Sequence, residues 1–178
     1  AEIVALNQAG DKAFGSDMYV TLEPCCHFGR TPPCTTSIIK SGVKNVYVSV
    51  LDPNPSVDGG GVNNLKDAGL EVSVGLNEKE SLNVTAPHFT LMRTGRPLVI
   101  AKFAMRLDGK IASVSGESKW ITGRKARERV HQLRSHSGAV MVGINTVLTD
   151  DPKLTARDGV LPEGFTQPLR VVVDSNMR

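Results

Sequence analysis

The first half of the chain alternates between two patterns of apolar residues. Ile3, Leu6 and Ala9 recur at helical spacing, and Gly10 predicts the end of that helix. Short β-branched and aromatic runs predict buried strands. We expect helices over residues 1–12, 34–40 and 62–68, and strands over residues 18–22, 45–50 and 70–74. This alternation predicts an α/β fold, in which helices cover a parallel sheet.

The second half is patterned less regularly. Residues 78–93 are expected to be helical as far as Pro87, and Thr94-Gly95-Arg96-Pro97 indicates a domain boundary. We therefore expect domains over residues 1–93 and 94–178. In the second domain we expect strands over residues 98–105, 139–142 and 169–174 and a short helical turn over residues 145–148.

One longer helix is expected in the second domain, over residues 123–134. Thr122 is its expected N-cap, because a hydroxyl there can accept a hydrogen bond from the first turn. Helical spacing predicts that Ala126, Val130 and Leu133 form its buried face.

Composition narrows the class of protein. Of the 178 residues, 40% are apolar and 22% charged, which is ordinary for a globular protein. The net charge of +3, without clustered Lys and Arg, argues against nucleic-acid binding. No apolar run approaches the roughly twenty residues that cross a bilayer, and the N-terminus does not resemble a signal peptide. Three cysteines without a secretion signal indicate a reducing compartment, and we expect the cytoplasm.

All three cysteines lie within residues 21–34, which read Thr-Leu-Glu-Pro-Cys-Cys-His-Phe-Gly-Arg-Thr-Pro-Pro-Cys. The two prolines before the last cysteine make this a stiff loop. Cys25 ends a predicted strand, and Cys34 begins a predicted helix whose dipole should help it to ionise. Two thiolates on one loop suit a zinc ion. The residues alone also allow a structural zinc site or a cluster of buried thiols, and they leave open whether His27 is a ligand.

This stretch resembles the deaminase signature of the bifunctional deaminase–reductase family of riboflavin biosynthesis. Zinc nucleobase deaminases share His-x-Glu followed by Pro-Cys-x-x-Cys. Here Pro24-Cys25 is present, the second cysteine comes nine positions later, and Ala1-Glu2 matches the end of His-Ala-Glu. The turn Asp52-Pro53-Asn54-Pro55, with the glycines after it, is similar to that family as well. The resemblance covers essentially the whole chain.

The resemblance implies a cytidine-deaminase-like domain with three layers, α/β/α, that carries out zinc-dependent hydrolytic deamination. Cys25 and Cys34 would bind the Zn²⁺, together with a histidine expected directly before Ala1. Glu2 would be the catalytic proton shuttle between water and the leaving amine.

The resemblance also implies how this domain binds its substrate, a small phosphorylated pyrimidine. His27 and Arg30 match positions that contact substrate in the family, and the guanidinium of Arg30 suits a phosphate. The family usually has serine where this chain has Cys26, so we expect Cys26 to be a bystander.

The second half has no Gly-x-Gly-x-x-Gly motif, which argues against a Rossmann fold. It resembles the reductase domain of the same family, an α/β domain like dihydrofolate reductase that uses NADPH. The matching runs are residues 102–112, 115–122, 143–148 and 150–157. The implied reaction is hydride transfer that opens the ribosyl group to a ribityl chain. Arg106 departs from the serine that is common in the family.

Carried over by position, the resemblance implies two sets of binding residues in the reductase. The NADPH site would be lined by Ala104, Trp120, Thr146, Asp150 and Ser175. The substrate would be held by Ser118, Arg134, Leu154 and Arg157. From the residues alone, Trp120 also fits a core position. We expect a solvated helix face to be formed by Arg124, Lys125, Arg127 and Arg129, and from the residues alone Arg134 could belong to it too.

Two other functions compete with this interpretation. A zinc deaminase acting on a free nucleoside or on RNA would have Cys-x-x-Cys spacing and no reductase motif, and neither condition is met. A non-enzymatic module held together by zinc would unfold in a chelator without any loss of turnover. The sequence leaves the oligomeric state open, a homo-oligomer included.

Compared with the family, the chain is expected to lack the start of the deaminase and the second half of the reductase. We therefore expect these 178 residues alone to be inactive in both reactions. Deamination by the isolated chain at the rate of a complete enzyme would contradict this expectation.

Overall fold

The computed structural model describes residues 1–29, 32–116, 120–157, 161 and 164–177. It forms two compact units, Ala1–Ile100 and Ala101–Arg178. The domain boundary after residue 93 stays a prediction. No helix among the described residues is long and apolar enough to cross a bilayer.

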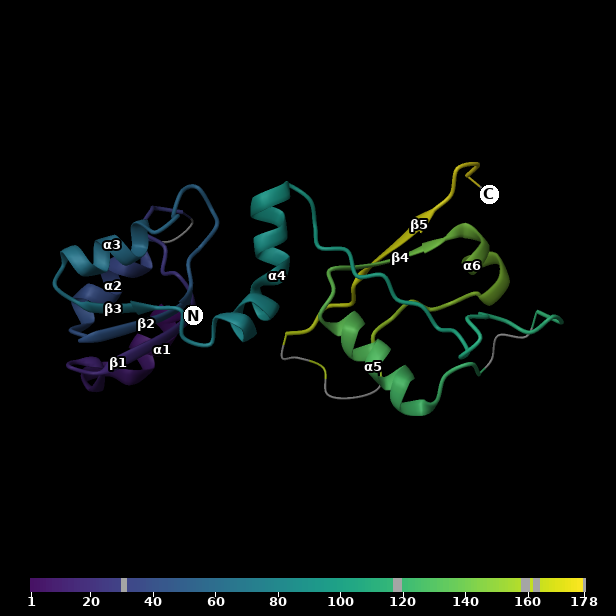
Figure 1. Cartoon of the computed structure of the whole chain (residues 1–178), viewed down its shortest axis with the longest axis horizontal. Coiled ribbons are helices and arrows are strands. Elements are labelled where there is room, and N and C mark those ends of the chain that lie inside the picture. The colour runs from purple at the N-terminus through teal and green to yellow at the C-terminus, as the bar shows by residue number, and fades with distance from the viewer. Residues whose placement is uncertain (30–31, 117–119, 158–160, 162–163, 178) are drawn as a thin grey trace. The chain divides into compact units, whose positions relative to one another are not determined.

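The first unit alternates helices and strands as expected (Figure 1). Its elements are α1 (Glu2–Ala9), the 3-10 helix η1 (Gly10–Ala13), β1 (Asp17–Leu22), α2 (Cys34–Ser41), β2 (Asn45–Val50), α3 (Gly60–Asp67), β3 (Glu71–Val74) and α4 (Glu78–Thr94). The three strands pair in the order β1-β2-β3, and both pairings are parallel. The predicted α/β class and parallel sheet are confirmed.

The core of the first unit lies between one face of this sheet and helices α1 to α3. Along β2 every second side chain is buried, and Val46 and Val48 are fully enclosed. They pack with Ile38 of α2 and Leu65 of α3. Burying each such side chain contributes about 1.5–3 kcal/mol. Small aliphatic residues thus form the core of a chain that is poor in aromatic residues.

Several helix ends differ from the sequence-based prediction. Helix α2 starts at Cys34 as expected and ends at Ser41, one residue later than expected, followed by Gly42 with a left-handed backbone. Helix α3 starts at Gly60, two residues early. The helix expected up to Pro87 is confirmed, and α4 continues through this proline to Thr94, over residues that the sequence alone leaves ambiguous.

Tertiary contacts explain why α4 continues past its proline. Phe89 is buried, and His88 Nε2 lies 2.8 Å from Asp52 Oδ1 in the turn after β2. These contacts hold the second half of the helix and offset the cost of the missing backbone hydrogen bond.

The second unit contains α5 (Arg124–Ser135), β4 (Ala139–Gly143), α6 (Ile144–Asp150) and β5 (Leu169–Val173). Strands β4 and β5 are parallel, with Ala139 opposite Leu169 and Gly143 opposite Val173. The strands expected near residues 139–142 and 169–174 are confirmed.

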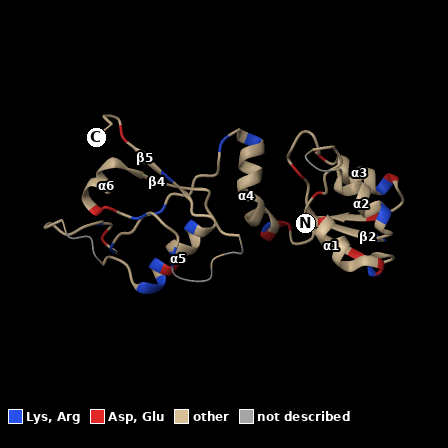
Figure 2. Ribbon diagram, turned by 180° about the vertical axis from the view of Figure 1, so that it is seen from behind, with Lys and Arg blue, Asp and Glu red and all other residues tan. Residues whose placement is uncertain are grey.

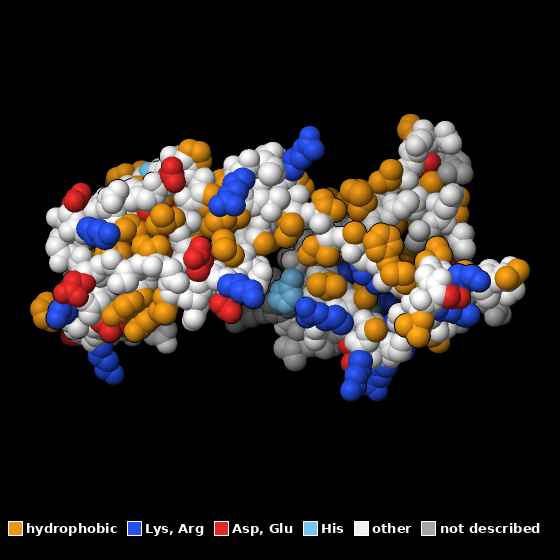
Figure 3. All heavy atoms as spheres, viewed as in Figure 1, with side chains coloured by type: hydrophobic (Ala, Val, Ile, Leu, Met, Phe, Trp, Pro, Cys, Tyr) orange, Lys and Arg blue, Asp and Glu red, His pale blue; other side chains and the backbone are white. Residues whose placement is uncertain are grey.

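The strand expected over residues 98–105 is wrong. These residues have no regular secondary structure, and Val99 and Phe103 are 81% and 74% exposed. Other apolar side chains are also exposed on the face that Figure 3 shows. A strand requires a neighbour for its N–H and C=O groups. In the described part of this unit, only β4 and β5 pair. A short apolar run can predict extended backbone but does not identify a pairing partner.

The predicted buried face of α5 is wrong at Ala126, which is exposed. Val130 and Leu133 are half-buried, and His131 is the buried side chain of this helix. Gly123, rather than Thr122, is its N-cap. The inward face of α5 is polar because it borders a cavity, so apolar periodicity could not locate it.

Candidate functional site

The first candidate site lies at the carboxyl ends of β1 and β2, where ligands commonly bind in parallel sheets. Cys25 follows β1, and Cys34 is the first residue of α2. The backbone N–H of Cys34 points at Cys25 Sγ with an N to S distance of 3.4 Å. From α1, Glu2 Oε2 lies 3.5 Å from Cys34 Sγ. The structure therefore brings together a carboxylate and two thiols from separate segments.

Burial, together with the neighbouring Cys25 and Glu2, raises the pKa of the Cys34 thiol to about 12 in the chain without a metal. The expectation that Cys34 ionises readily is wrong for this state. The helix dipole is outweighed by desolvation and by nearby negative charge. A zinc ion would reverse this balance, because a coordinating thiol loses its proton to the metal.

The two cysteines fit a zinc ion in chemistry and position, but they are two ligands. Within the described ranges, no group of three or more His, Cys, Asp and Glu side chains could hold a metal by itself. His27 Nδ1 is buried and has no hydrogen-bond partner in the part of the chain that the structure describes. Arg30, predicted to contact the substrate, lies outside the described residues.

Cys26 faces away from these groups. Its Sγ lies 4.0 Å from the carbonyl oxygen of Ser56, in the loop that precedes α3. This contact agrees with the expectation that Cys26 takes no part in metal binding. Glu23 was missed at the sequence level, although its carboxylate is buried beside the cysteine loop. Its position between a strand and a proline carries no pattern that would have identified it.

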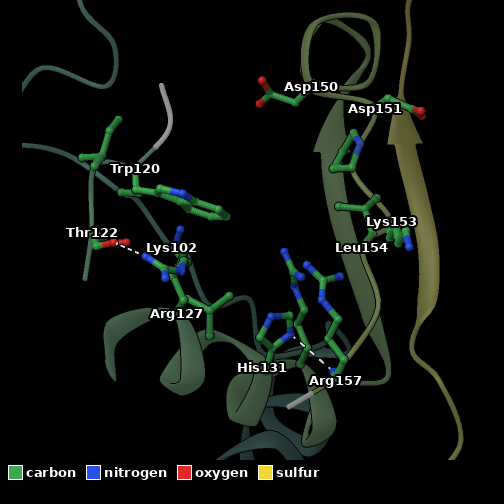
Figure 4. A pocket seen from close by; sticks show the side chains of 15 residues that line it. Lys102, Trp120, Thr122, Arg127, His131, Asp150, Asp151, Lys153, Leu154 and Arg157 are labelled. Atoms are coloured by element: carbon green, nitrogen blue, oxygen red, sulfur yellow. Dashed lines mark hydrogen bonds between the residues drawn. The ribbon is translucent and has the colours of Figure 1, made fainter. Parts of the chain in front are cut away.

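The second candidate site is a cavity of about 550 Å³ within the second unit (Figure 4). It is lined by Lys102, Ala104, Trp120, Ile121, Thr122, Arg127, Val130, His131, Arg134, Asp150, Asp151, Pro152, Lys153, Leu154 and Arg157. Basic side chains outnumber acidic ones on its wall, and the basic residues of α5 are visible in Figure 2. The cavity suits an anionic ligand.

Six residues expected at the reductase site line this cavity, namely Ala104, Trp120, Arg134, Asp150, Leu154 and Arg157. Thr146 on α6 and Ser175 after β5 are exposed, and neither is among the described lining residues. Ser118 lies outside the described part of the chain. The cavity wall also includes Lys102, His131 and Lys153, which were not predicted as site residues. A single Lys or His in a loop or helix forms no motif by which it could be recognised in the sequence.

Two arginines in the cavity lack an acidic partner. Arg134 Nη1 donates to the carbonyl oxygen of Thr155 at 3.2 Å, and Arg157 Nη1 donates to Thr155 Oγ1 at 3.3 Å. In the part of the unit that the structure describes, neither forms an ion pair with a carboxylate. Burial, and secondarily the nearby Arg157, lowers the pKa of Arg134. Unpaired guanidinium groups at a cavity wall are well suited to bind phosphate.

Trp120 is not a core residue, because it is 74% exposed at the rim of the cavity. The guanidinium carbon of Arg127 lies 4.2 Å from the centroid of its ring, and Arg127 Nη1 donates to the carbonyl oxygen of Thr122 (Figure 4). The interpretation of Arg127 as part of a solvated face is therefore wrong. It does hold for Arg124, which pairs with Glu128 on the exposed side of α5.

Comparison with known families finds two separate matches within the chain. Residues 1–50 match the family described as the cytidine and deoxycytidylate deaminase zinc-binding region. Residues 97–178 match the family described as the RibD C-terminal domain. The cytidine-deaminase-like domain and the reductase-type domain predicted after it are thereby confirmed.

Similar proteins and structures agree. The chain is 50% identical to the riboflavin biosynthesis protein RibD of Aquifex aeolicus, covering 99% of the chain and 49% of the relative. It is 46% identical to RibD of Escherichia coli, covering 100% of the chain and 51% of the relative.

Among solved structures, Acinetobacter baumannii RibD matches with a TM-score of 0.90 and 48% identity, over 100% of the chain and 51% of that structure. A Thermotoga maritima structure, described as a diaminohydroxyphosphoribosylaminopyrimidine deaminase/5-amino-6-(5-phosphoribosylamino)uracil reductase, matches with a TM-score of 0.86 and 43% identity. That match covers 99% of the chain and 48% of the structure. The chain spans about half the length of the curated relatives it matches. Over nearly its whole length the chain is similar to about half of the riboflavin biosynthesis protein RibD.

Proposed function

We propose that the chain is part of a bifunctional enzyme of riboflavin biosynthesis and that its first unit is the deaminase. The observation that carries this proposal is the convergence of Glu2, Cys25 and Cys34 at one edge of the sheet. The proposed substrate is a phosphoribosylaminopyrimidine, in line with the name of the Thermotoga maritima structure.

In this proposal Cys25 and Cys34 hold the Zn²⁺, with a histidine directly before Ala1 as the third ligand. A bound zinc ion supplies a water molecule of lowered pKa for attack on the amino-bearing carbon. Glu2 takes a proton from the attacking water and gives it to the leaving amine. His27, whose Nδ1 lacks a partner among the described residues, would bind the pyrimidine.

We further propose that the second unit reduces the deaminated product with NADPH. The supporting observation is the basic cavity, whose wall includes Arg134, Arg157 and Trp120 and where neither arginine pairs with a carboxylate among the described residues. In this proposal the arginines hold the substrate phosphate, and Trp120, Ala104 and Asp150 border the cofactor. Thr146, Ser175 and Ser118 stay predictions. The proposed compartment is the cytoplasm, and both ligands are small molecules.

The proposal is tested with the full-length protein and the phosphoribosylaminopyrimidine. Ammonia release should require zinc, and NADPH oxidation should follow only after deamination has supplied its substrate. Removing zinc with a chelator should stop ammonia release but leave reduction of the purified deaminated product unchanged. Ammonia release that persists after zinc is removed would contradict the proposed deaminase.

Replacing Arg157 with glutamine should raise the reductase KM for its phosphorylated substrate by roughly tenfold to a hundredfold. The reason is the loss of a charge-assisted hydrogen bond to phosphate. Arg129→Gln is the matched control, because Arg129 lies on the exposed side of α5, where it bonds Gln132. Steady-state kinetics and inhibition by inorganic phosphate measure the effect. Equal KM values for the two variants would exclude Arg157 from phosphate binding.

Trp120 should report NADPH binding by fluorescence. NADPH absorbs where tryptophan emits, so cofactor bound in the cavity should quench the emission of Trp120 by energy transfer. In the full-length protein, Trp120→Phe should abolish this part of the NADPH-dependent quenching. Quenching of the same size in the variant would place the cofactor away from Trp120.

A further inference from the structure

A buried carboxylate beside the cysteine loop binds three backbone N–H groups and has no part in the chemistry proposed above. Glu23 follows β1 and is 4% exposed. Its Oε2 accepts from the N–H of Asp52 at 3.1 Å and of Gly59 at 3.0 Å. Its Oε1 accepts from the N–H of Val62 at 2.9 Å. Since burying an unpaired carboxylate is costly, these three bonds are what makes the position tolerable.

Two of the three N–H groups belong to the start of α3. Gly59 is the N-cap of that helix, and Val62 lies in its first turn. The N–H groups of a first turn lack partners within the helix, and the helix dipole favours negative charge there. No side chain of α3 itself caps its N-terminus. Glu23 therefore supplies the cap from the end of a neighbouring strand.

The backbone around Glu23 is packed closely against the same turn of α3. A Cβ added to Gly61 would overlap the carbonyl oxygen of Pro24 and lie 3.1 Å from Glu23 Cγ. A Cβ added to Gly60 would lie 3.0 Å from Cys26 Sγ. The cysteine loop and the start of α3 thus fit together without space for another side chain.

The third N–H group links the carboxylate to the turn after β2. Asp52 Oδ1 accepts from the backbone N–H of Asn54 at 2.9 Å and lies 2.8 Å from His88 Nε2. This turn lies beside the cysteine loop, because the paired strands β1 and β2 end at the same edge, with Leu22 opposite Val50. One carboxylate therefore connects the cysteine loop, the Asp52 turn and the N-terminus of α3.

We propose that Glu23 is a positioning residue of the deaminase site. It holds the segment from Asp52 to Val62 against the backbone of Cys25 and so sets the direction in which the Cys25 thiolate faces the metal. The proposal rests on the zinc deaminase function proposed above. Residues that orient metal ligands from outside typically change metal affinity or activity by about 10–100-fold when they are replaced.

The test replaces Glu23 with glutamine in the full-length protein. A glutamine carbonyl can take the place of Oε2 and keep the bonds to Asp52 and Gly59. Its NH₂ group then faces the N–H of Val62, a donor against a donor. Zinc affinity, measured by competition with a chromophoric chelator, should fall at least about tenfold. Amide hydrogen exchange at Val62 should accelerate more than at Asp52 or Gly59.

Glu71→Gln is the control, because Glu71 is an exposed carboxylate on β3 of the same unit. It should leave zinc affinity and the exchange rate of Val62 unchanged. If Glu23→Gln does not fold, Glu23→Asp retains the charge with a shorter reach and should show weakened zinc binding.

Zinc binding by the variant and by the wild-type protein tests the role of Glu23 separately from the proposed deaminase function. Wild-type zinc affinity in the folded variant would overturn the role of Glu23 and leave the zinc deaminase standing, even if the melting temperature fell. Absence of zinc binding by the wild-type protein would overturn both.

Discussion

Replacing Cys34 with alanine should remove zinc from the full-length protein and abolish ammonia release, while NADPH oxidation with the deaminated product continues. Cys34 lies next to both Cys25 and Glu2, so its loss leaves one thiol and a proton shuttle without a metal. Deaminase activity should fall by more than about a hundredfold, because replacing residues that only support the metal ligands already lowers activity by up to about that factor. The reductase should persist because its cavity belongs to the other compact unit.

Cys26→Ser provides the matched control for this experiment. Cys26 lies in the same loop, yet its Sγ faces the carbonyl oxygen of Ser56, and a serine hydroxyl can make the same contact. Zinc content after gel filtration and both reaction rates should match the wild type. Loss of zinc in Cys26→Ser, or retention of zinc in Cys34→Ala, would assign the ligands differently.

The cysteine loop was predictable because its chemistry is local in the sequence. The thiols of Cys25 and Cys34 lie on a single stiff loop between a strand and a helix, and both flanking elements follow from short-range patterns. The sequence could not show which of several influences sets the pKa of the Cys34 thiol. The dipole of α2 is a local feature, but burial and the approach of Glu2 from α1 arise only on folding.

The second unit was harder to predict, for a related reason. Helix α5 turns His131, Arg127 and Arg134 toward the cavity. Apolar periodicity identified Val130, which also lines the cavity, but it could not identify these polar residues, and it wrongly included the exposed Ala126. Residues 98–105 form an apolar run of the length of a strand, but pairing depends on a partner distant in sequence. Leu154 and Arg157, identified by the order of motifs along the chain, both line the cavity, and their role in substrate binding stays a prediction.

Gly61→Ala should be among the most destabilising single substitutions in the first unit. Gly61 lies in the first turn of α3, where an added Cβ would overlap the backbone carbonyl oxygen of Pro24. A backbone atom cannot move aside as the end of a flexible side chain can, so either α3 or the cysteine loop must shift. The overpacking should cost about 3 kcal/mol or more. For a unit of this size that lowers the melting temperature by roughly 12 °C or more.

The same shift should reach the metal, because Pro24 directly precedes Cys25. We therefore expect Gly61→Ala to lose zinc more readily than the wild type, even at temperatures where it stays folded. Gly29→Ala is the control, since an added Cβ there meets no described atom within 4 Å and its φ is not positive. That variant should stay within about 0.5 kcal/mol of the wild type in chemical denaturation. Equal stability of the two variants would mean that α3 and the cysteine loop are not packed against each other at Gly61. This result would also count against the proposed positioning role of Glu23.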